Sequence, residues 1–197
     1  MLDLKNYKVI LASKSPRRQQ LLKGMDIDFD VLVKDVDESF PNSLKGKDIA
    51  LMLSERKAMA FAADELPENF LLITADTIVL VDDDVLNKPA DSHEAFNMLK
   101  TLSGREHNVV TAVTLRTDKQ LRSFFELSAV RFGALSDEEI VWYVHRYMPL
   151  DKAGAYGIQE WIGYVAIASV KGSFFNVMGL PTHRLFMELK KFAGTEV

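Results

Sequence analysis

The sequence of 197 residues contains no cysteine. This absence excludes a disulfide framework, a thiolate metal site and a cysteine nucleophile. It is compatible with a reducing compartment, and we expect a cytoplasmic protein. Histidine is also scarce, and its four copies lack the spacing of a metal site, so we expect structural roles for all of them. They are His93, His107, His145 and His183.

Long apolar runs and an excess of positive charge are missing as well. The longest apolar candidate, residues 161–170, is far too short to span a bilayer, and the first residues lack the pattern of a signal peptide. The net charge is −4, whereas duplex nucleic acid requires an extended basic surface. We therefore expect neither a membrane nor a nucleic-acid partner. One focused basic pocket for a small polyanion remains compatible with this charge.

Hydrophobic residues make up 48% of the chain and charged residues 26%, which is typical of a globular protein. There is no repeat or evident linker, so we expect a single domain over 1–197, with two lobes around one cleft. β-prone runs alternate with helical patterns and with strand pairs, which predicts an α/β fold with a mixed sheet. The predicted strands are 7–11, 26–36, 70–81, 85–86, 108–116, 123–132 and 164–170, with a turn at 82–84. The predicted helices are 16–23, 47–63, 92–102, 137–147 and 182–192.

The stretch from Leu11 to Leu22 (LASKSPRRQQLL) reads as a strand end, a tight turn and a helix start. Ser15 suits the N-cap and Pro16 the first helical position. Arg17 and Arg18 then lie in the first turn, where cations are unfavourable against the helix dipole unless an anion binds there. The pattern indicates a phosphate site, and the alternative is a solvated basic face.

Asp76 interrupts a run that otherwise reads as a buried central strand, where aspartate is rare. A carboxylate in such a place must be paired, bound to a metal or shifted in pKa. We interpret Asp76 as a metal ligand or general base, and the alternative is a structural ion pair or a local turn. The neighbouring Thr74 and Thr77 are also polar, which favours a strand that opens onto a cleft.

Other candidate residues depend on what the fold brings together. If the loop that carries Glu38 and Asp37 lies beside Asp76, either acid could hold Mg²⁺ together with Asp76. Otherwise each is a surface acid. Lys57 and Lys88 are candidate phosphate ligands or else ordinary solvated lysines. Gln159 ends a loop rich in glycine and alanine, where its amide could pair with the edge of a base, unless the loop is merely a flexible surface segment.

Taken together, these motifs resemble the Maf family. The matching segments run in the family's order over nearly the whole chain, and the combination of the Ser-Arg-Arg and Ala-Asp-Thr motifs is highly specific. They are residues 11–18, 55–58, 75–79, 88–89, 150–159 and 172–181. One departure is Lys14, where many relatives have a small residue.

The resemblance implies a nucleoside triphosphate pyrophosphatase, which cleaves between the α- and β-phosphates. It also implies an elongated, two-lobed fold with a central cleft, similar to that of the inosine triphosphate pyrophosphatases. Asp76 corresponds to the proton acceptor, and Glu38 to an acidic residue near a divalent metal, Mg²⁺ or Mn²⁺. The remaining matched positions bind substrate or set its choice. They are Ser13, Arg17, Arg18, Lys57, Thr77, Lys88 and Gln159.

The Gly-Ile-Gln end of the loop resembles the branch that acts on dTTP and UTP, and modified pyrimidine triphosphates are further candidate substrates. A homodimer is compatible with the resemblance. Maf proteins have also been linked to inhibition of septum formation. The alternative function is therefore a nucleotide-binding regulator of cell division without significant catalysis.

Overall fold

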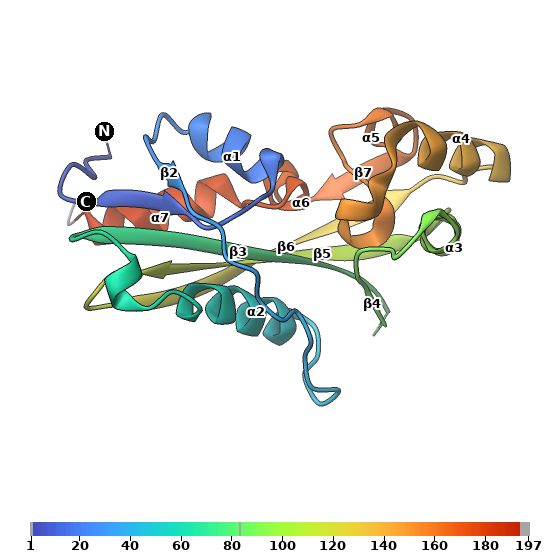
Figure 1. Ribbon diagram of the computed structural model, residues 1–197. Helices are drawn as coiled ribbons and strands as arrows, with labels where there is room; N and C mark the ends of the chain where they lie inside the picture. Colours follow the sequence, from blue (N-terminus) through green and yellow to red (C-terminus); the bar gives the residue numbers. More distant parts are fainter. Residues whose placement is uncertain (1, 83, 194–197) are drawn as a thin grey trace. The chain divides into compact units, whose positions relative to one another are not determined.

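The computed structural model describes residues 2–82 and 84–193 (Figure 1). Its strands are β1 (Lys8–Leu11), β2 (Asp30–Val31), β3 (Phe70–Val81), β4 (Asp84–Leu86), β5 (Glu106–Arg116), β6 (Leu121–Phe132) and β7 (Ile167–Lys171). Its α-helices are α1 (Pro16–Lys23), α2 (Lys47–Met59), α3 (Ser92–Leu102), α4 (Asp137–Tyr147), α5 (Trp161–Val165), α6 (Phe174–Met178) and α7 (Thr182–Phe192). Short 3₁₀ turns are η1 (Ala63–Glu65), η2 (Pro149–Asp151) and η3 (Ala153–Ala155).

The sheet has the strand order β2-β1-β3-β5-β6-β7, and β4 pairs with β3 off this path. β1 runs parallel to β2 and to β3, whereas the β3–β4 and β6–β7 pairs are antiparallel. Parallel pairs need crossover connections and antiparallel pairs accept hairpins, so this topology is the mixed α/β class predicted from the sequence. The prediction of the fold class is confirmed.

Most predicted boundaries agree with the structure. β3 and α7 begin and end at the predicted residues, and Ser136 and Glu139 form a reciprocal capping box at the start of α4. The hairpin after β3 is also present, although Asp83 of its predicted turn lies outside the described residues. The capping box accounts for the start of α4, whereas α7 begins after Pro181 without a side-chain cap.

Three predictions were wrong in part. The strand expected over 26–36 is reduced to Asp30–Val31, whose side chains are exposed and supply no buried face to extend the pairing. The helix expected to reach Ala63 ends at Met59, and Ala63 begins a separate 3₁₀ turn. The run 164–170 is divided between α5 and β7, because a short apolar run does not distinguish a helix from a strand.

The chain forms two compact units. Unit 1 comprises Met1–Asp76, Thr111–Glu126 and Gly179–Val197, and unit 2 comprises Thr77–Val110 and Leu127–Met178. The division along β3 thus falls between Asp76 and Thr77, so the predicted site residues are distributed over both units. The expectation of one domain with two lobes around a cleft stays a prediction.

Unit 1 packs α2 against the sheet through one apolar cluster. Ala58 and Phe61 meet Ile10 of β1 and Phe70 and Leu72 of β3. α1 lies on the opposite face of the sheet from α2 (Figure 1). The two helices that carry Arg18 and Lys57 are therefore both anchored next to the strand that carries Asp76.

Unit 2 packs α3 against α4 and against the turns η2 and η3. Three rings, those of His107, Phe132 and Tyr156, meet edge to face with centroids 5.0–5.4 Å apart, and His107 Nε2 lies 2.8 Å from the Tyr156 hydroxyl. Burial lowers the pKa of His107 to about 4 and raises the pKa of Tyr156. Both groups are therefore neutral near pH 7, as suits a structural core.

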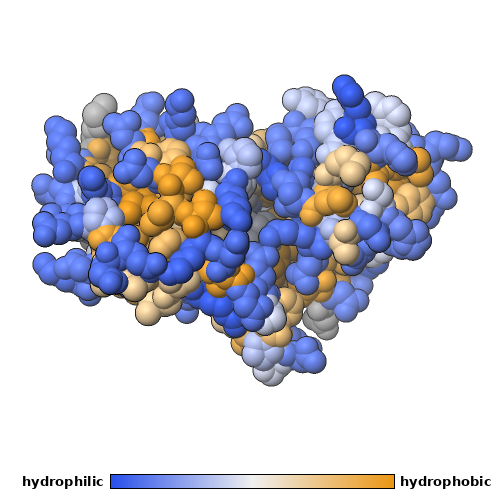
Figure 2. All heavy atoms as spheres, viewed as in Figure 1, coloured by the Kyte–Doolittle hydropathy of each residue, from blue (hydrophilic) through white to orange (hydrophobic). Residues whose placement is uncertain are grey.

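The face of the molecule in Figure 2 mixes hydrophilic and apolar side chains. Tyr164 is the most exposed large apolar residue among those described, with 84% of its surface accessible. Within residues 2–82 and 84–193, no helix combines the length and apolarity needed to cross a membrane.

Candidate active site

Asp76 lies in β3 and only 9% of its side chain is exposed. Its Oδ1 atom is 2.5 Å from Nζ of Lys57, which projects from α2. A buried carboxylate without such a partner would carry a large desolvation cost, so this ion pair explains how β3 tolerates an acid. The ion pair given above as the alternative for Asp76 is therefore present, and the pair also belongs to a larger cluster.

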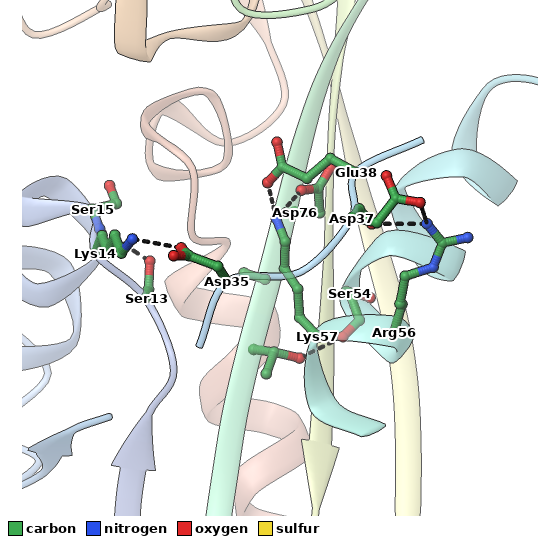
Figure 3. Close-up of polar contacts among 12 residues, drawn as sticks. Ser13, Lys14, Ser15, Asp35, Asp37, Glu38, Ser54, Arg56, Lys57 and Asp76 are labelled. Carbon is green, nitrogen blue, oxygen red and sulfur yellow. Dashed lines mark hydrogen bonds and ion pairs between the residues drawn. The ribbon is translucent and has the colours of Figure 1, made fainter. Parts of the chain in front are cut away.

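Glu38 contributes the second carboxylate of this cluster. Its Oε1 atom is 2.8 Å from Nζ of Lys57, so a single ammonium contacts both Glu38 and Asp76 (Figure 3). The loop that follows β2 thus lies beside Asp76, which was the condition for Glu38 to be a candidate metal ligand. Lys57, predicted as a phosphate ligand, joins two acids here.

Asp37, the equal candidate from the sequence, points elsewhere. Its carboxylate accepts hydrogen bonds from the Ser39 hydroxyl and backbone N–H, at 2.6 and 2.9 Å. It also lies 3.9 Å from Arg56 (Figure 3). The two bonds from Ser39 lower the pKa of Asp37. Of the two neighbouring acids, Glu38 is the one that the structure places with Asp76.

A chain of buried hydroxyl groups fixes the helix that carries Lys57. The Thr74 hydroxyl donates to the backbone oxygen of Ser54 at 2.7 Å, and the Ser54 hydroxyl lies 2.9 Å from that of Thr114. Ser54 precedes Lys57 by about one helical turn, and Thr74 precedes Asp76 by two residues on β3. These bonds therefore set the register between the two members of the ion pair.

The turn before α1 has the predicted capping. The Ser15 side chain accepts from the backbone N–H of Arg18 at 3.5 Å, Pro16 occupies the first turn, and no acid lies in that turn. Ser13 is buried, and its hydroxyl accepts from the backbone N–H of Ser15 at 3.2 Å. Backbone N–H groups and the cation Arg17 thus share one helix end, which is a favourable place for an anion.

Arg18 links α1 to the strand of Asp76. Its Nη1 donates to the backbone oxygen of Ala75 at 2.8 Å, and its Nε donates to that of Gly179 at 2.8 Å. Burial lowers the pKa of Arg18, and the charge of Asp76 opposes this shift. Lys14, in contrast, is exposed and pairs with Asp35 at 2.6 Å.

The other predicted residues belong to unit 2. Thr77 is the only residue of β3 that is not fully buried, and Lys88 is exposed just after β4. Gln159 is half-buried, and its Oε1 atom is buried with no hydrogen-bond partner among residues 2–82 and 84–193. A buried amide oxygen without a partner is costly, and such atoms are common where a ligand completes the bonding.

Sequence reasoning missed the side chains that surround Gln159. Tyr143 of α4 donates its hydroxyl to Glu160 and accepts from the backbone N–H of Gly157 at 3.1 Å. Glu160 in turn lies 3.2 Å from the buried Lys152. The available signal was a lysine and a glutamate, Lys152 and Glu160, at the two ends of the loop segment 153–159 that carries Gln159.

The donor set at Asp76 suits a small divalent cation. Two carboxylates already converge on one cation, the ammonium of Lys57, and carboxylate oxygens are the ligands that Mg²⁺ and Mn²⁺ prefer. Across the described part of the chain, no three histidine or acidic side chains form a group that could hold a metal ion.

Known proteins resemble this chain over nearly its whole length. Residues 8–192 match the family model described as Maf-like protein. A dTTP/UTP pyrophosphatase of Porphyromonas gingivalis is 52% identical over 195 residues, which cover 98% of each chain. A dTTP/UTP pyrophosphatase of Parabacteroides distasonis is 50% identical over 191 residues, 96% of this chain and 98% of that protein. One from Flavobacterium johnsoniae is 48% identical over 183 residues, 93% of this chain and 94% of that protein.

Proposed function

Since this chain belongs to the Maf family, we propose that it hydrolyses dTTP and UTP to the nucleoside monophosphate and pyrophosphate. The observation that carries the proposal is the near-complete alignment with proteins named dTTP/UTP pyrophosphatase. The buried acid Asp76, held by Lys57, adds a group that can act on water. Modified pyrimidine triphosphates are further candidate substrates.

In the proposed reaction, Asp76 accepts a proton from a water molecule as that water attacks the α-phosphorus. The bond between the α-phosphorus and the bridging oxygen to the β-phosphate breaks, and pyrophosphate leaves in line. Phosphoryl transfer depends mainly on positioning and charge stabilisation, and here Lys57 fixes the Asp76 carboxylate through a 2.5 Å contact. A strand and a helix joined by buried hydroxyl groups are a rigid support for this pair.

Cationic side chains and one helix end would bind the triphosphate. Arg17 and the N-terminus of α1 offer positive charge and N–H donors, and Ser13 shapes the preceding turn. Lys88 supplies a further exposed ammonium in unit 2. Arg18 lies next to Asp76 and adds its charge while it holds α1 against β3.

A divalent metal, Mg²⁺ or Mn²⁺, would be held by Glu38 and Asp76. When bound, it would neutralise phosphate oxygens and withdraw charge from the reacting phosphorus. Lys57 would then compete with the metal for the same carboxylates, because its ammonium lies 2.8 and 2.5 Å from them. We expect the addition of Mg²⁺ or Mn²⁺ to raise the rate of hydrolysis, and parallel assays with each ion compare their effects.

The base would be selected by Gln159 and Thr77 in unit 2. A glutamine amide can donate and accept at once, which matches the adjacent N–H and C=O of thymine or uracil. The buried Oε1 atom of Gln159, without a partner in the described part of the chain, supports this role. We also expect the protein to form a homodimer, which light scattering in solution tests.

The test is a pyrophosphate-release screen of natural and modified nucleoside triphosphates with Mg²⁺ or Mn²⁺. Release of pyrophosphate and the monophosphate from dTTP and UTP, ahead of the other nucleotides, is the expected result. Release of orthophosphate, or no preference among bases, would contradict the proposal. Tight binding of dTTP without any hydrolysis would instead favour the nucleotide-binding regulator.

A further inference from the structure

A chain of polar contacts in unit 2 ends at the peptide segment that carries Gln159. The Tyr143 hydroxyl accepts from the backbone N–H of Gly157 at 3.1 Å and donates to the Glu160 carboxylate. The other carboxylate oxygen of Glu160 lies 3.2 Å from Nζ of Lys152. Lys152 also donates to Asp151 at 2.7 Å, which completes the chain of contacts. We call these four side chains, from Tyr143, Asp151, Lys152 and Glu160, the loop network.

Three members of the loop network are largely buried, whereas 57% of the Asp151 side chain is accessible. Tyr143 has no exposed surface, and 8% of the Lys152 side chain and 16% of the Glu160 side chain are accessible. Burial, and next the hydrogen bond to Glu160, raise the pKa of Tyr143, so its hydroxyl keeps its proton and can donate. Deleting one member therefore leaves other buried polar groups without partners.

The network clamps both sides of Gln159. Gly157 and Glu160 flank residues 158–159, and the backbone N–H of Glu160 also donates to the oxygen of Gly157 at 2.9 Å. Space is tight as well, because a Cβ at Gly157 would lie 2.9 Å from Gln159 Nε2 and 2.8 Å from Glu160 Cδ. The Gln159 amide is therefore restrained by its neighbours on either side.

We propose that Tyr143, Lys152 and Glu160 are positioning residues that hold the Gln159 amide in the orientation that distinguishes one base from another. The inference rests on the proposed role of Gln159 in reading the base. In this position the Oε1 atom of Gln159 is buried without a hydrogen-bond partner among residues 2–82 and 84–193, as expected of an acceptor that a bound base would complete. Base selection then depends on residues that touch no substrate.

The experiment compares dTTP with dCTP, whose bases differ in the donors and acceptors at one edge. Tyr143→Phe keeps the ring but removes both hydrogen bonds, so we expect the ratio of kcat/KM for dTTP over dCTP to fall about tenfold. The change should appear in KM for dTTP, with kcat nearly unchanged. Tyr147→Phe, in the stacked ring on the same helix, is the matched control and should leave the ratio unaltered.

A double-mutant cycle separates positioning from general destabilisation. In a Gln159→Ala background, Tyr143→Phe should change the dTTP/dCTP ratio less than twofold. Two outcomes would overturn the inference while leaving the role of Gln159 intact. In one, Tyr143→Phe lowers the dTTP/dCTP ratio equally in both backgrounds. In the other, Tyr143→Phe leaves the ratio unchanged although Gln159→Ala lowers it. If Tyr143→Phe does not fold, Glu160→Gln replaces it, because Glu160 is partly accessible. The same fall in the dTTP/dCTP ratio is then expected.

Failure of the proposed function has a different signature. If Gln159→Ala itself retains the full dTTP/dCTP ratio, Gln159 does not read the base, and the positioning inference fails with it. If the wild-type protein releases no pyrophosphate, dissociation constants for the α,β-imido analogues of dTTP and dCTP replace kcat/KM. The same ratios then decide the inference, independently of catalysis.

Discussion

Nζ of Lys57 lies 2.5 Å from Oδ1 of Asp76, so the acid of a central strand is paired with a cation from a separate helix. The same ammonium lies 2.8 Å from Glu38. One positive charge therefore serves two carboxylates, and the nearby Arg18 guanidinium balances the remaining negative charge. The packing of α2 against β3 thus forms the ion pair on which the proposed chemistry depends.

Asp76→Asn should reduce kcat for dTTP by about 10²–10⁴-fold, the range typical of losing a general base. The amide is the same size and still fits beside Lys57, so we expect the folded structure to persist. Pyrophosphate release measures the rate, and circular dichroism measures the fold. Asp37→Asn is the matched control, because Asp37 bonds to Ser39 instead, and it should keep near wild-type turnover. Turnover by Asp76→Asn close to wild type would remove Asp76 from the mechanism.

Lys57→Met should impair both stability and catalysis. It leaves Asp76 buried without its cation, and breaking a buried pair costs about 3–5 kcal/mol. Because 18% of the Lys57 side chain is accessible, we expect about 3 kcal/mol, measured as the free energy of unfolding in urea. Lys14→Met breaks an exposed pair with Asp35 and should change that free energy by less than about 0.5 kcal/mol. Equal stability losses for the two variants would show that the Lys57 pair is not special.

The mixed sheet and the start of α1 could be predicted from sequence because they depend on local signals. Ser15 and Pro16 define a helix start by themselves, and residues 70–81 are unbroken in apolar character except around Asp76. The partner of Asp76 could not be predicted in the same way. Lys57 and Glu38 lie 19 and 38 residues before it, and only tertiary packing decides which of the neighbouring acids, Asp37 or Glu38, faces the cluster.

The loop network shows the same limit. Tyr143 reads as an ordinary helical aromatic, and nothing near it in sequence indicates that its hydroxyl meets Gly157. Helix α5 was missed because residues 161–165 are too few and too apolar for a helical period to appear. Close packing around Gly163, which sequence alone does not reveal, decides the path of this segment.

Acid should destabilise the fold partly through His107. Burial lowers its pKa to about 4 in the folded state, below the ordinary value of about 6.5 in the unfolded chain. The unfolded state therefore binds more protons between these values, and the stability due to neutral His107 is lost as the pH falls from about 6.5 toward 4. We expect this histidine to account for about 2 kcal/mol between pH 7 and pH 5.

The measurement is the free energy of unfolding in urea at pH 7 and pH 5, for the wild type and for His107→Phe. The variant loses the bond to Tyr156 at both pH values. Its free energy of unfolding should nevertheless fall less than that of the wild type between pH 7 and pH 5, by about 2 kcal/mol. His93→Phe, at an exposed position on α3, controls for histidine titration in general. An identical pH dependence in wild type and His107→Phe would show that the buried imidazole is not responsible.

Gly163→Ala should disturb the segment just before Gln159. A Cβ at Gly163 would lie 1.7 Å from the backbone oxygen of Ile158, a distance that only movement of the main chain can relieve. We expect a loss of about 1–3 kcal/mol in unfolding free energy, as for other overpacked sites, and a raised KM for dTTP. Gly133→Ala is the matched control in the same unit, because its Cβ would lie an ordinary 3.6 Å from the oxygen of Ala166. It should change stability by no more than about 0.5 kcal/mol. If Gly163→Ala loses stability but keeps the wild-type KM, the shift of the Ile158 oxygen does not move Gln159. The loop would then be more flexible than its contacts imply.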